Sequence, residues 1–221
     1  MDPSVRSMTS SDLAQVASLH RVAFASSLGV SLGHSYVRRM LAHFLAANDA
    51  ISLICEIDGT VAGYVFGAPD DEWPKVNRRL LPTIAFAVLT HPAVMLHPDF
   101  RGKIHYRVKS LLTHVTPIDT HTDENRARAP APVYDLVGIG VDPRRRGRGV
   151  AQALMAAFEE MAPRLGYRSL LLSAYSDNHA ARRLYERRHW DVLSDDGRAV
   201  YYVKTFDLPP PSGPKSLEGT P

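Results

Sequence analysis

Four arginines and two glycines stand together in one short segment, Pro143-Arg-Arg-Arg-Gly-Arg-Gly149, which we call the arginine turn. A strand pattern over residues 134–141 precedes it, and an amphipathic helical pattern follows over residues 149–164. The first turn of a helix offers N–H groups without intrahelical partners, and glycines let the backbone approach an anion closely. The arginine turn therefore predicts a site for the diphosphate of a nucleotide-containing cofactor.

Other phosphate motifs fit this segment less well. A P-loop needs Gly-Lys-Ser/Thr, whereas this turn ends in Gly149-Val-Ala-Gln152. The dinucleotide pattern G-x-G-x-x-G fails because Pro143 stands where the third glycine belongs after Gly138 and Gly140. An arginine-rich, solvated turn with no ligand remains the alternative.

A second pair of residues could act on a bound cofactor. Asn178 and Tyr185 are seven residues apart in a predicted helix, so they share one face about 10 Å apart along the axis. Tyrosine is protonated at neutral pH and can donate a proton to a leaving group. The alternative is that Tyr185 only packs in the core beside Leu184.

These two motifs resemble those of one known family. The segment Arg144-Arg-Arg-Gly-Arg-Gly-Val-Ala151 resembles the Q/R-x-x-G-x-G/A signature of the GNAT family of N-acetyltransferases. The segment Asn178-His-Ala-Ala-Arg-Arg-Leu-Tyr-Glu-Arg-Arg-His-Trp190 is similar to the family's N-x-x-A-x-x-L-Y-x-x-x-G-F/W pattern. His189 departs from it, because glycine is usual there at the turn that ends the helix. The resemblance covers about residues 134–206.

The resemblance implies an α/β fold with a mixed, mostly antiparallel central sheet, splayed middle strands and flanking helices. It also implies direct transfer of an acetyl group from acetyl-CoA to a primary amine of a small molecule, an amino-sugar or a peptide. A non-catalytic acyl-CoA-binding regulatory module of the same fold is the alternative. On this reading Tyr185 is the catalytic acid. The residues that would bind the co-substrate are Ile139, Gly140, Val141, Arg144, Arg145, Arg146, Gly147, Arg148, Gly149, Val150, Ala151 and Asn178.

The strand before the arginine turn should contribute its backbone. Gly138 and Gly140 weaken it and suggest a bulge or a close backbone approach. An exposed edge over residues 136–141 could pair with the peptide-like pantetheine arm, and an N–H near residues 139–141 could bind the thioester oxygen. At the start of the strand, where the family often has an acidic base, Asp135 is the candidate base, and the alternative is that it caps an exposed strand end. Simple alternation places it on the same face as Val137, Ile139 and Val141.

Further strands are predicted over residues 4–8, 51–57, 61–67, 168–174, 190–193 and 199–206, with helices after 12, over 35–47 and over 178–188. One domain should span residues 1–207, with an insertion at about 69–131 and a disordered Pro-rich tail at 208–221. The prolines of the insertion predict short or interrupted helices, near 80–88 and 108–115, and an exposed loop over 116–132. Three acidic residues at 70–72 could meet a cationic amine or simply be solvated.

Composition limits the remaining possibilities. The 221 residues carry a formal net charge of +3, and the arginine turn lacks the aromatic neighbours that single-stranded nucleic acid would need, so no nucleic-acid partner is expected. The one cysteine, Cys55, should be a buried apolar residue.

We expect no metal site, since the histidines at 91, 97, 105, 114 and 121 lack ligand spacing. His20, His34 and His43 should lie at the surface. No signal peptide or membrane span is evident, which favours a cytoplasmic protein, and a homodimer is left open.

Overall fold

The structure is a computed structural model, and it describes residues 3–25, 27–69, 72–96 and 123–207. The helical run expected at 108–115 and the tail at 208–221 lie outside these residues. Within them, no helix combines the length and the apolar character that a membrane span requires.

Seven strands of the described residues form one sheet in the order β1-β2-β3-β4-β5-β7-β6. They are β1 (Ser4–Ser7), β2 (Ile51–Ile57), β3 (Thr60–Pro69), β4 (Val133–Val141), β5 (Ser169–Tyr175), β6 (Asp191–Asp195) and β7 (Ala199–Thr205). Strands β4 and β5 run parallel, and the other neighbouring pairs run antiparallel. The predicted mixed, mostly antiparallel sheet is confirmed.

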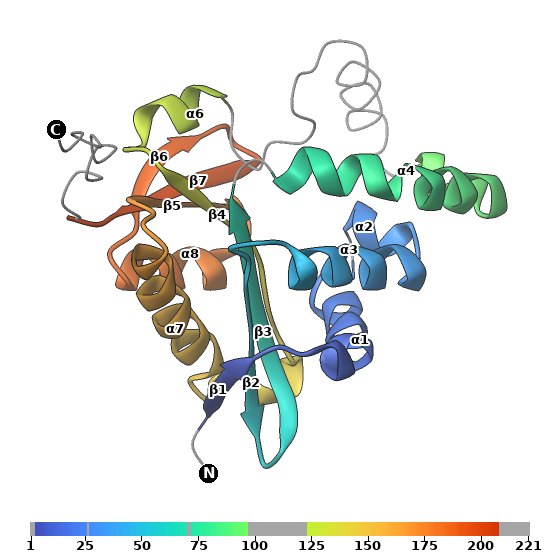
Figure 1. The fold of residues 1–221 in the computed structure, drawn as a ribbon, viewed down its shortest axis with the longest axis horizontal. Helices are drawn as coiled ribbons and strands as arrows, with labels where there is room; N and C mark the ends of the chain where they lie inside the picture. Colours follow the sequence, from blue (N-terminus) through green and yellow to red (C-terminus); the bar gives the residue numbers. More distant parts are fainter. Residues whose placement is uncertain (1–2, 26, 70–71, 97–122, 208–221) are drawn as a thin grey trace, which may run out of the picture.

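Helices cover both faces of this sheet (Figure 1). On one face lie α1 (Leu13–Ala23), α2 (Leu28–Ser31), α3 (His34–Ala46) and α4 (Glu72–Thr90), with the short 3-10 helices η1 (Ser10–Asp12) before α1 and η2 (Pro92–Leu96) after α4. On the other face lie α7 (Val150–Arg164) and α8 (His179–Arg187), and α6 (Asp123–Arg128) lies beside β6. The chain enters α7 through η3 (Pro143–Arg145).

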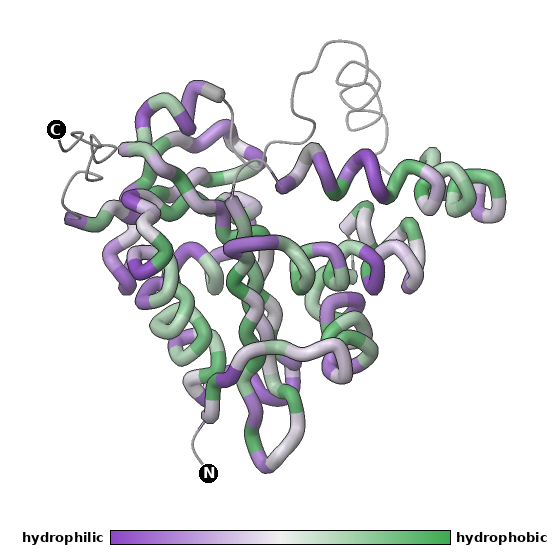
Figure 2. Tube along the Cα trace, viewed as in Figure 1, coloured by the Kyte–Doolittle hydropathy of each residue, from purple (hydrophilic) through white to green (hydrophobic). Residues whose placement is uncertain are grey.

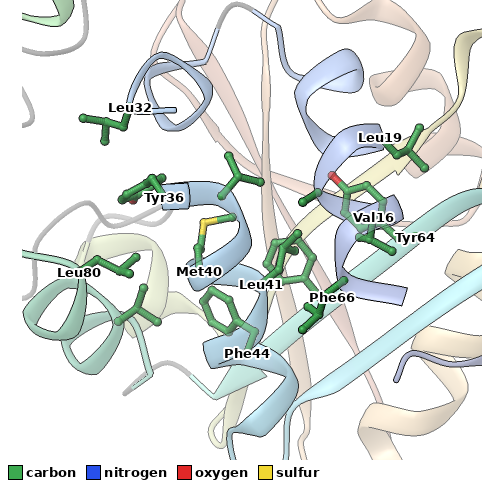
Figure 3. Packing of buried hydrophobic residues seen from close by; sticks show 14 of the residues in the cluster. Val16, Leu19, Leu32, Tyr36, Met40, Leu41, Phe44, Tyr64, Phe66 and Leu80 are labelled. Carbon is green, nitrogen blue, oxygen red and sulfur yellow. The ribbon is translucent and has the colours of Figure 1, made fainter. Parts of the chain in front are cut away.

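Alternation along β3 divides the core into two parts. Tyr64 and Phe66 face α1 and α3, whereas Val65 faces α7. In Figure 3, Phe44 of α3 lies beside Phe66, with their ring centroids 5.2 Å apart. Hydrophobic residues follow the middle strands between the two helical layers (Figure 2). The predicted burial of Cys55 is confirmed. The two cores hold the middle strands rigidly from both sides.

Two regions of the insertion differ from expectation. Helix α4 is long and continues through Pro82, although the prolines predicted short or interrupted helices. A proline within a helix costs about 3 kcal/mol, but Val76, Leu80 and Ile84 on one side of α4 are buried against the core and offset that loss. The loop expected at 116–132 includes helix α6, and the buried Asn125 of α6 hydrogen-bonds Ser194 of β6.

His20 was expected at the surface, and this expectation is wrong. Its side chain is buried on α1, stacks on Phe24 with ring centroids 4.8 Å apart, and shares a 2.6 Å hydrogen bond between Nδ1 and the Tyr64 hydroxyl. Burial lowers the pKa of His20 to about 4. The His20 imidazole is therefore neutral at neutral pH and buried between α1 and β3.

This buried imidazole predicts a loss of stability in mild acid. His20 takes up its proton near pH 6.5 in the unfolded chain but only near pH 4 in the folded chain. Protonation of His20 therefore does not reduce the unfolding free energy above pH 6.5, and it lowers that free energy by about 3 kcal/mol as the pH falls from 6.5 to 4. We expect His20→Gln, which cannot titrate, to flatten the pH dependence of the unfolding free energy in this window. The exposed His34→Gln should keep the slope, and equal slopes in the wild type and His20→Gln would contradict the assignment.

Candidate active site

The two parallel strands at the centre of the sheet separate soon after they meet. β4 and β5 pair only at Val133–Ser169, Tyr134–Leu170 and Asp135–Leu171. Beyond these residues β4 continues alongside β3 up to Val141, while β5 continues alongside β7. The β5-facing edge of β4 over residues 136–141 therefore has no strand partner among the described residues, which confirms the predicted splay.

A bulge in β4 accompanies this separation. Phe66 pairs with Gly138 and Gly67 pairs with Leu136, so Val137 is an extra residue on β4. Because of this residue, Tyr134 and Leu136 share the α7 face with Ile139 and Val141. The expected alternation, with Asp135 on the face of Ile139 and Val141, is wrong because the bulge reverses the pattern at Val137.

The two glycines of β4 allow aromatic rings of β3 to pass beneath the strand. A Cβ at Gly140 would lie 2.6 Å from Cε1 of Tyr64, and a Cβ at Gly138 would lie 3.0 Å from Cε1 of Phe66. The sequence predicted a bulge or a close backbone approach at these glycines. The close approach is made by the rings of Tyr64 and Phe66.

A cavity of about 490 Å³ opens where β4 and β5 part. Its floor is β4 from Leu136 to Val141 and β5 from Ser173 to Tyr175. Its walls come from the end of α1, the start of α8, the arginine turn and the β6–β7 hairpin. These contribute Phe24, Ser27, Arg146, Asn178, Ala181, Tyr185, Asp196, Arg198 and Tyr201. The volume lies within the range of small-molecule sites.

The arginine turn leads from β4 into α7 at one end of this cavity. The Asp142 carboxylate accepts the Arg144 N–H at 2.9 Å and starts η3. Gly147 and Gly149 have φ values of +77° and +79°, a region that favours glycine, and no atom lies within 4 Å of a Cβ built on Gly147. Helix α7 begins at Val150, so the N–H groups of Val150 and Ala151 lie in its first turn, where helices bind anions.

The four arginines of the turn are not equivalent. Arg144 pairs with Asp142 at 2.8 Å, and Arg145 lies 3.6 Å from Asp58 in the β2–β3 hairpin. Arg146 lines the cavity, and Arg148 is exposed. The spacing alone gave all four the same role, but the structure brings only Arg146 to the cavity.

Asn178 and Tyr185 both line the cavity, which agrees with the prediction that they lie on one face of the helix. The Asn178 side chain accepts the Ala181 N–H at 3.2 Å and so caps α8. The Tyr185 side chain is largely buried, and its ring centroid lies 6.0 Å from that of Trp190 and 5.5 Å from that of Tyr202. Burial raises the pKa of Tyr185 well above its ordinary value, so its hydroxyl stays protonated.

The structure places the candidate base Asp135 away from this cavity. Asp135 is fully buried, and its carboxylate accepts a 2.7 Å hydrogen bond from Arg126 of α6. The carboxylate that lines the cavity belongs to Asp196 in the β6–β7 turn. The backbone N–H groups of Ala199 and Arg198 lower the pKa of Asp196 and keep it ionised. No motif in the sequence marks this residue.

The acidic run at 70–72 is represented in the described residues by Glu72. This side chain is buried and contacts His43 of α3 at 3.0 Å and Lys75 at 2.6 Å. His43 was expected at the surface, and this expectation is wrong, because its side chain lies against Glu72 and is only 11% exposed. Across the part of the chain that the structure describes, no three potential metal ligands cluster.

Residues 117–190 match the family model described as the acetyltransferase (GNAT) family. This stretch contains β4, the arginine turn, β5 and α8, four of the elements that border the cavity. The resemblance to the GNAT family is confirmed. No curated protein matches the chain.

Solved structures with the GNAT fold cover almost the whole chain. An N-acetyltransferase from Staphylococcus aureus Mu50 superposes with a TM-score of 0.57 at 14% identity, covering 93% of this chain and 99% of that one. A putative acetyltransferase from Salmonella typhimurium, solved with acetyl-CoA, gives 0.56 at 15% identity over 94% and 95%. The PaiA N-acetyltransferase from Thermoplasma acidophilum, in complex with coenzyme A, gives 0.54 at 13% identity over 93% and 100%. The family match supports acetyl transfer in general and leaves the acceptor open.

The contact between Gly140 and Tyr64 gives a steric prediction. Tyr64 is fully buried and bonded to His20, so its ring cannot yield to a new methyl group. We expect Gly140→Ala to lower the unfolding free energy by about 1–3 kcal/mol in denaturant titrations. Gly29→Ala, whose Cβ would lie at an ordinary 3.4 Å from Tyr36, is the matched control.

A second background tests the cause of that loss. Tyr64→Leu removes the ring atoms that the new methyl group would meet. The substitution Gly140→Ala should then cost clearly less than it does in the wild type. An equal cost in both backgrounds would show that the ring contact is not responsible.

Proposed function

We propose that this protein transfers an acetyl group from acetyl-CoA to a primary amine of a small molecule, an amino-sugar or a peptide. The observation that carries the proposal is the cavity at the split between β4 and β5, which the arginine turn borders through Arg146 and α8 borders through Tyr185. The proposed anion site, the β4 edge without a strand partner among the described residues, and the proposed proton donor would thus meet in one place.

The residues present fit the co-substrate. The N–H groups at the start of α7 and the open space at Gly147 suit a diphosphate, with Arg146 and Arg148 supplying positive charge. The unpaired edge of β4 suits the pantetheine arm, which resembles a peptide and can pair with it as an added strand. The ligands of the Salmonella and Thermoplasma structures support the same assignment.

Acetyl-CoA would supply a thioester, whose carbonyl carbon accepts the amine and whose sulfur leaves with the bonding electrons. An N–H group of Ile139 or Val141, on the edge of β4 that faces away from β3, would stabilise the negative charge that develops on the carbonyl oxygen. Tyr185, kept protonated by burial, would donate its proton to the departing sulfur. Asn178 would contact the pantetheine arm from the start of α8.

The amine must lose a proton during attack, because amines of the lysine type are charged at neutral pH. Asp196 is an ionised carboxylate at the cavity wall and could accept this proton through water. The assignment of Asp135 as base stays a prediction. Its ion pair with Arg126 favours a role in holding β4 against α6.

Binding of coenzyme A by calorimetry tests the donor side. Gly147→Asp and Gly149→Asp place a carboxylate at the proposed diphosphate site, and we expect both to abolish measurable binding. Gly166→Asp is the matched control, because Gly166 also has a positive φ, +88°, but lies at the opposite end of α7. Unchanged affinity in both turn variants would refute the diphosphate site.

Release of free thiol from acetyl-CoA, screened over classes of amine, tests the chemistry. We expect turnover with at least one class, and a fall in kcat of about 100-fold for Tyr185→Phe with unchanged affinity for coenzyme A. Tight binding without release for any amine would instead favour a non-catalytic acyl-CoA-binding regulatory module.

A further inference from the structure

One buried carboxylate on α7 holds the segment that follows α8. Glu159 is 8% exposed. Its Oε1 accepts hydrogen bonds from Arg188 Nε and Trp190 Nε1, both at 2.8 Å. Its Oε2 accepts from Arg188 Nη2 at 2.9 Å and from Lys204 Nζ of β7 at 2.8 Å. A single side chain thus joins α7, the end of α8 and β7.

The charge on this carboxylate is maintained in the folded protein. Burial alone would raise the pKa of Glu159, but the hydrogen bonds from Arg188, Lys204 and Trp190 outweigh it and hold the pKa below its usual value. Apolar replacements of buried ion pairs are often at least as stable, so such a cluster is weak evidence for a purely stabilising role. Its geometry gives it another role.

The clamped segment is bonded directly to Tyr185. The backbone N–H groups of Arg188 and Trp190 both donate to the Tyr185 carbonyl, at 3.0 and 3.1 Å. The Trp190 ring packs against the Tyr185 ring. Lys204 Nζ also donates to the Arg188 carbonyl at 2.7 Å. Residues bonded to Glu159 therefore contact Tyr185 twice, through their backbone N–H groups at its carbonyl and through the Trp190 ring at its ring.

The turn between these contacts is strained. His189 has a φ of +58°, in the left-handed region that a residue with a Cβ rarely adopts. The residues on either side of it, Arg188 and Trp190, are the ones that Glu159 binds. The cluster thus fixes a turn that this sequence would not favour by itself.

We propose that Glu159 is a positioning residue that acts through Arg188 and Trp190 to fix the Tyr185 hydroxyl at the cavity. The proposal rests on the proposed function, in which Tyr185 protonates the leaving thiolate. Displacing a catalytic group by about 1 Å can cost about 100-fold in rate. Glu159 therefore governs kcat from outside the cavity.

Kinetics of Glu159→Gln test this role against a matched control. We expect kcat for thiol release to fall about 10- to 100-fold, while KM for acetyl-CoA stays within about twofold. Glu160→Gln, in which the neighbouring exposed carboxylate loses its pair with Arg164, should leave both constants unchanged. A folded Glu159→Gln enzyme with wild-type kcat would overturn the proposal.

A milder variant guards against a failure of Glu159→Gln to fold. Trp190→Phe removes the indole N–H that Glu159 accepts and keeps an aromatic ring beside Tyr185. If Trp190 acts through Tyr185, its substitution should lower kcat in the wild type and have little further effect in Tyr185→Phe. Equal reductions in both backgrounds would mean that the cluster acts only through general stability.

A readout without turnover separates this proposal from the proposed function. In protein labelled with carbon-13 at tyrosine Cζ, Tyr185→Phe assigns the Tyr185 resonance. Glu159→Gln or Trp190→Phe should shift that resonance, and Glu160→Gln should not. An unmoved resonance in both variants overturns the positioning role. Absence of thiol release from the wild type would instead count against acetyl transfer, whatever the resonance does.

Discussion

The site depends on the separation of β4 from β5 after three paired residues. Parallel strands normally satisfy each other's backbone groups along their length. Here the bulge at Val137 and the glycines at 138 and 140 let β4 stay with β3 while β5 follows β7. The separation leaves a strand edge facing a cavity, and the arginine turn begins where that edge ends.

Opposite sides of the split are held by different contacts. On the α1 side, Tyr64 fits beneath Gly140 and is bonded to His20, which fixes the end of β4 from below. On the α7 side, Glu159 gathers the segment after α8 and holds Tyr185 at the cavity wall. The strand edge and the proton donor belong to different halves of the sheet. Their relative placement therefore depends on these two buried polar contacts.

Local backbone chemistry was predictable from the sequence. Asp58-Gly59, a common hairpin dipeptide, forms the turn between β2 and β3 with φ values of +53° and +68°, and Gly166 ends α7 at +88°. His189 adopts the positive φ that the family's glycine implied. These features follow from the preferences of single residues, and for that reason the motifs and most element boundaries were correct.

Features that depend on residues far apart in the chain were not predictable. The reversal of alternation in β4 arises from register with β3, and the continuation of α4 through Pro82 arises from its packing on the core. The partner of Asp135, Arg126, lies in a segment that reads as a polar loop. Glu159 carries no sequence signal for burial, because it is polar and its partners are distant in sequence. His20 falls on the apolar side of α1 with Val16 and Ala17, but its partner Tyr64 is distant in sequence.

Backbone amide spectra recorded during a titration with coenzyme A test most directly whether the ligand occupies this split. The account predicts that the resonances of Ile139 to Val141 and of Gly147 to Ala151 shift on saturation, while that of Gly166 at the far end of α7 does not. Saturable binding that leaves the amides of β4 and of the arginine turn unshifted would contradict it.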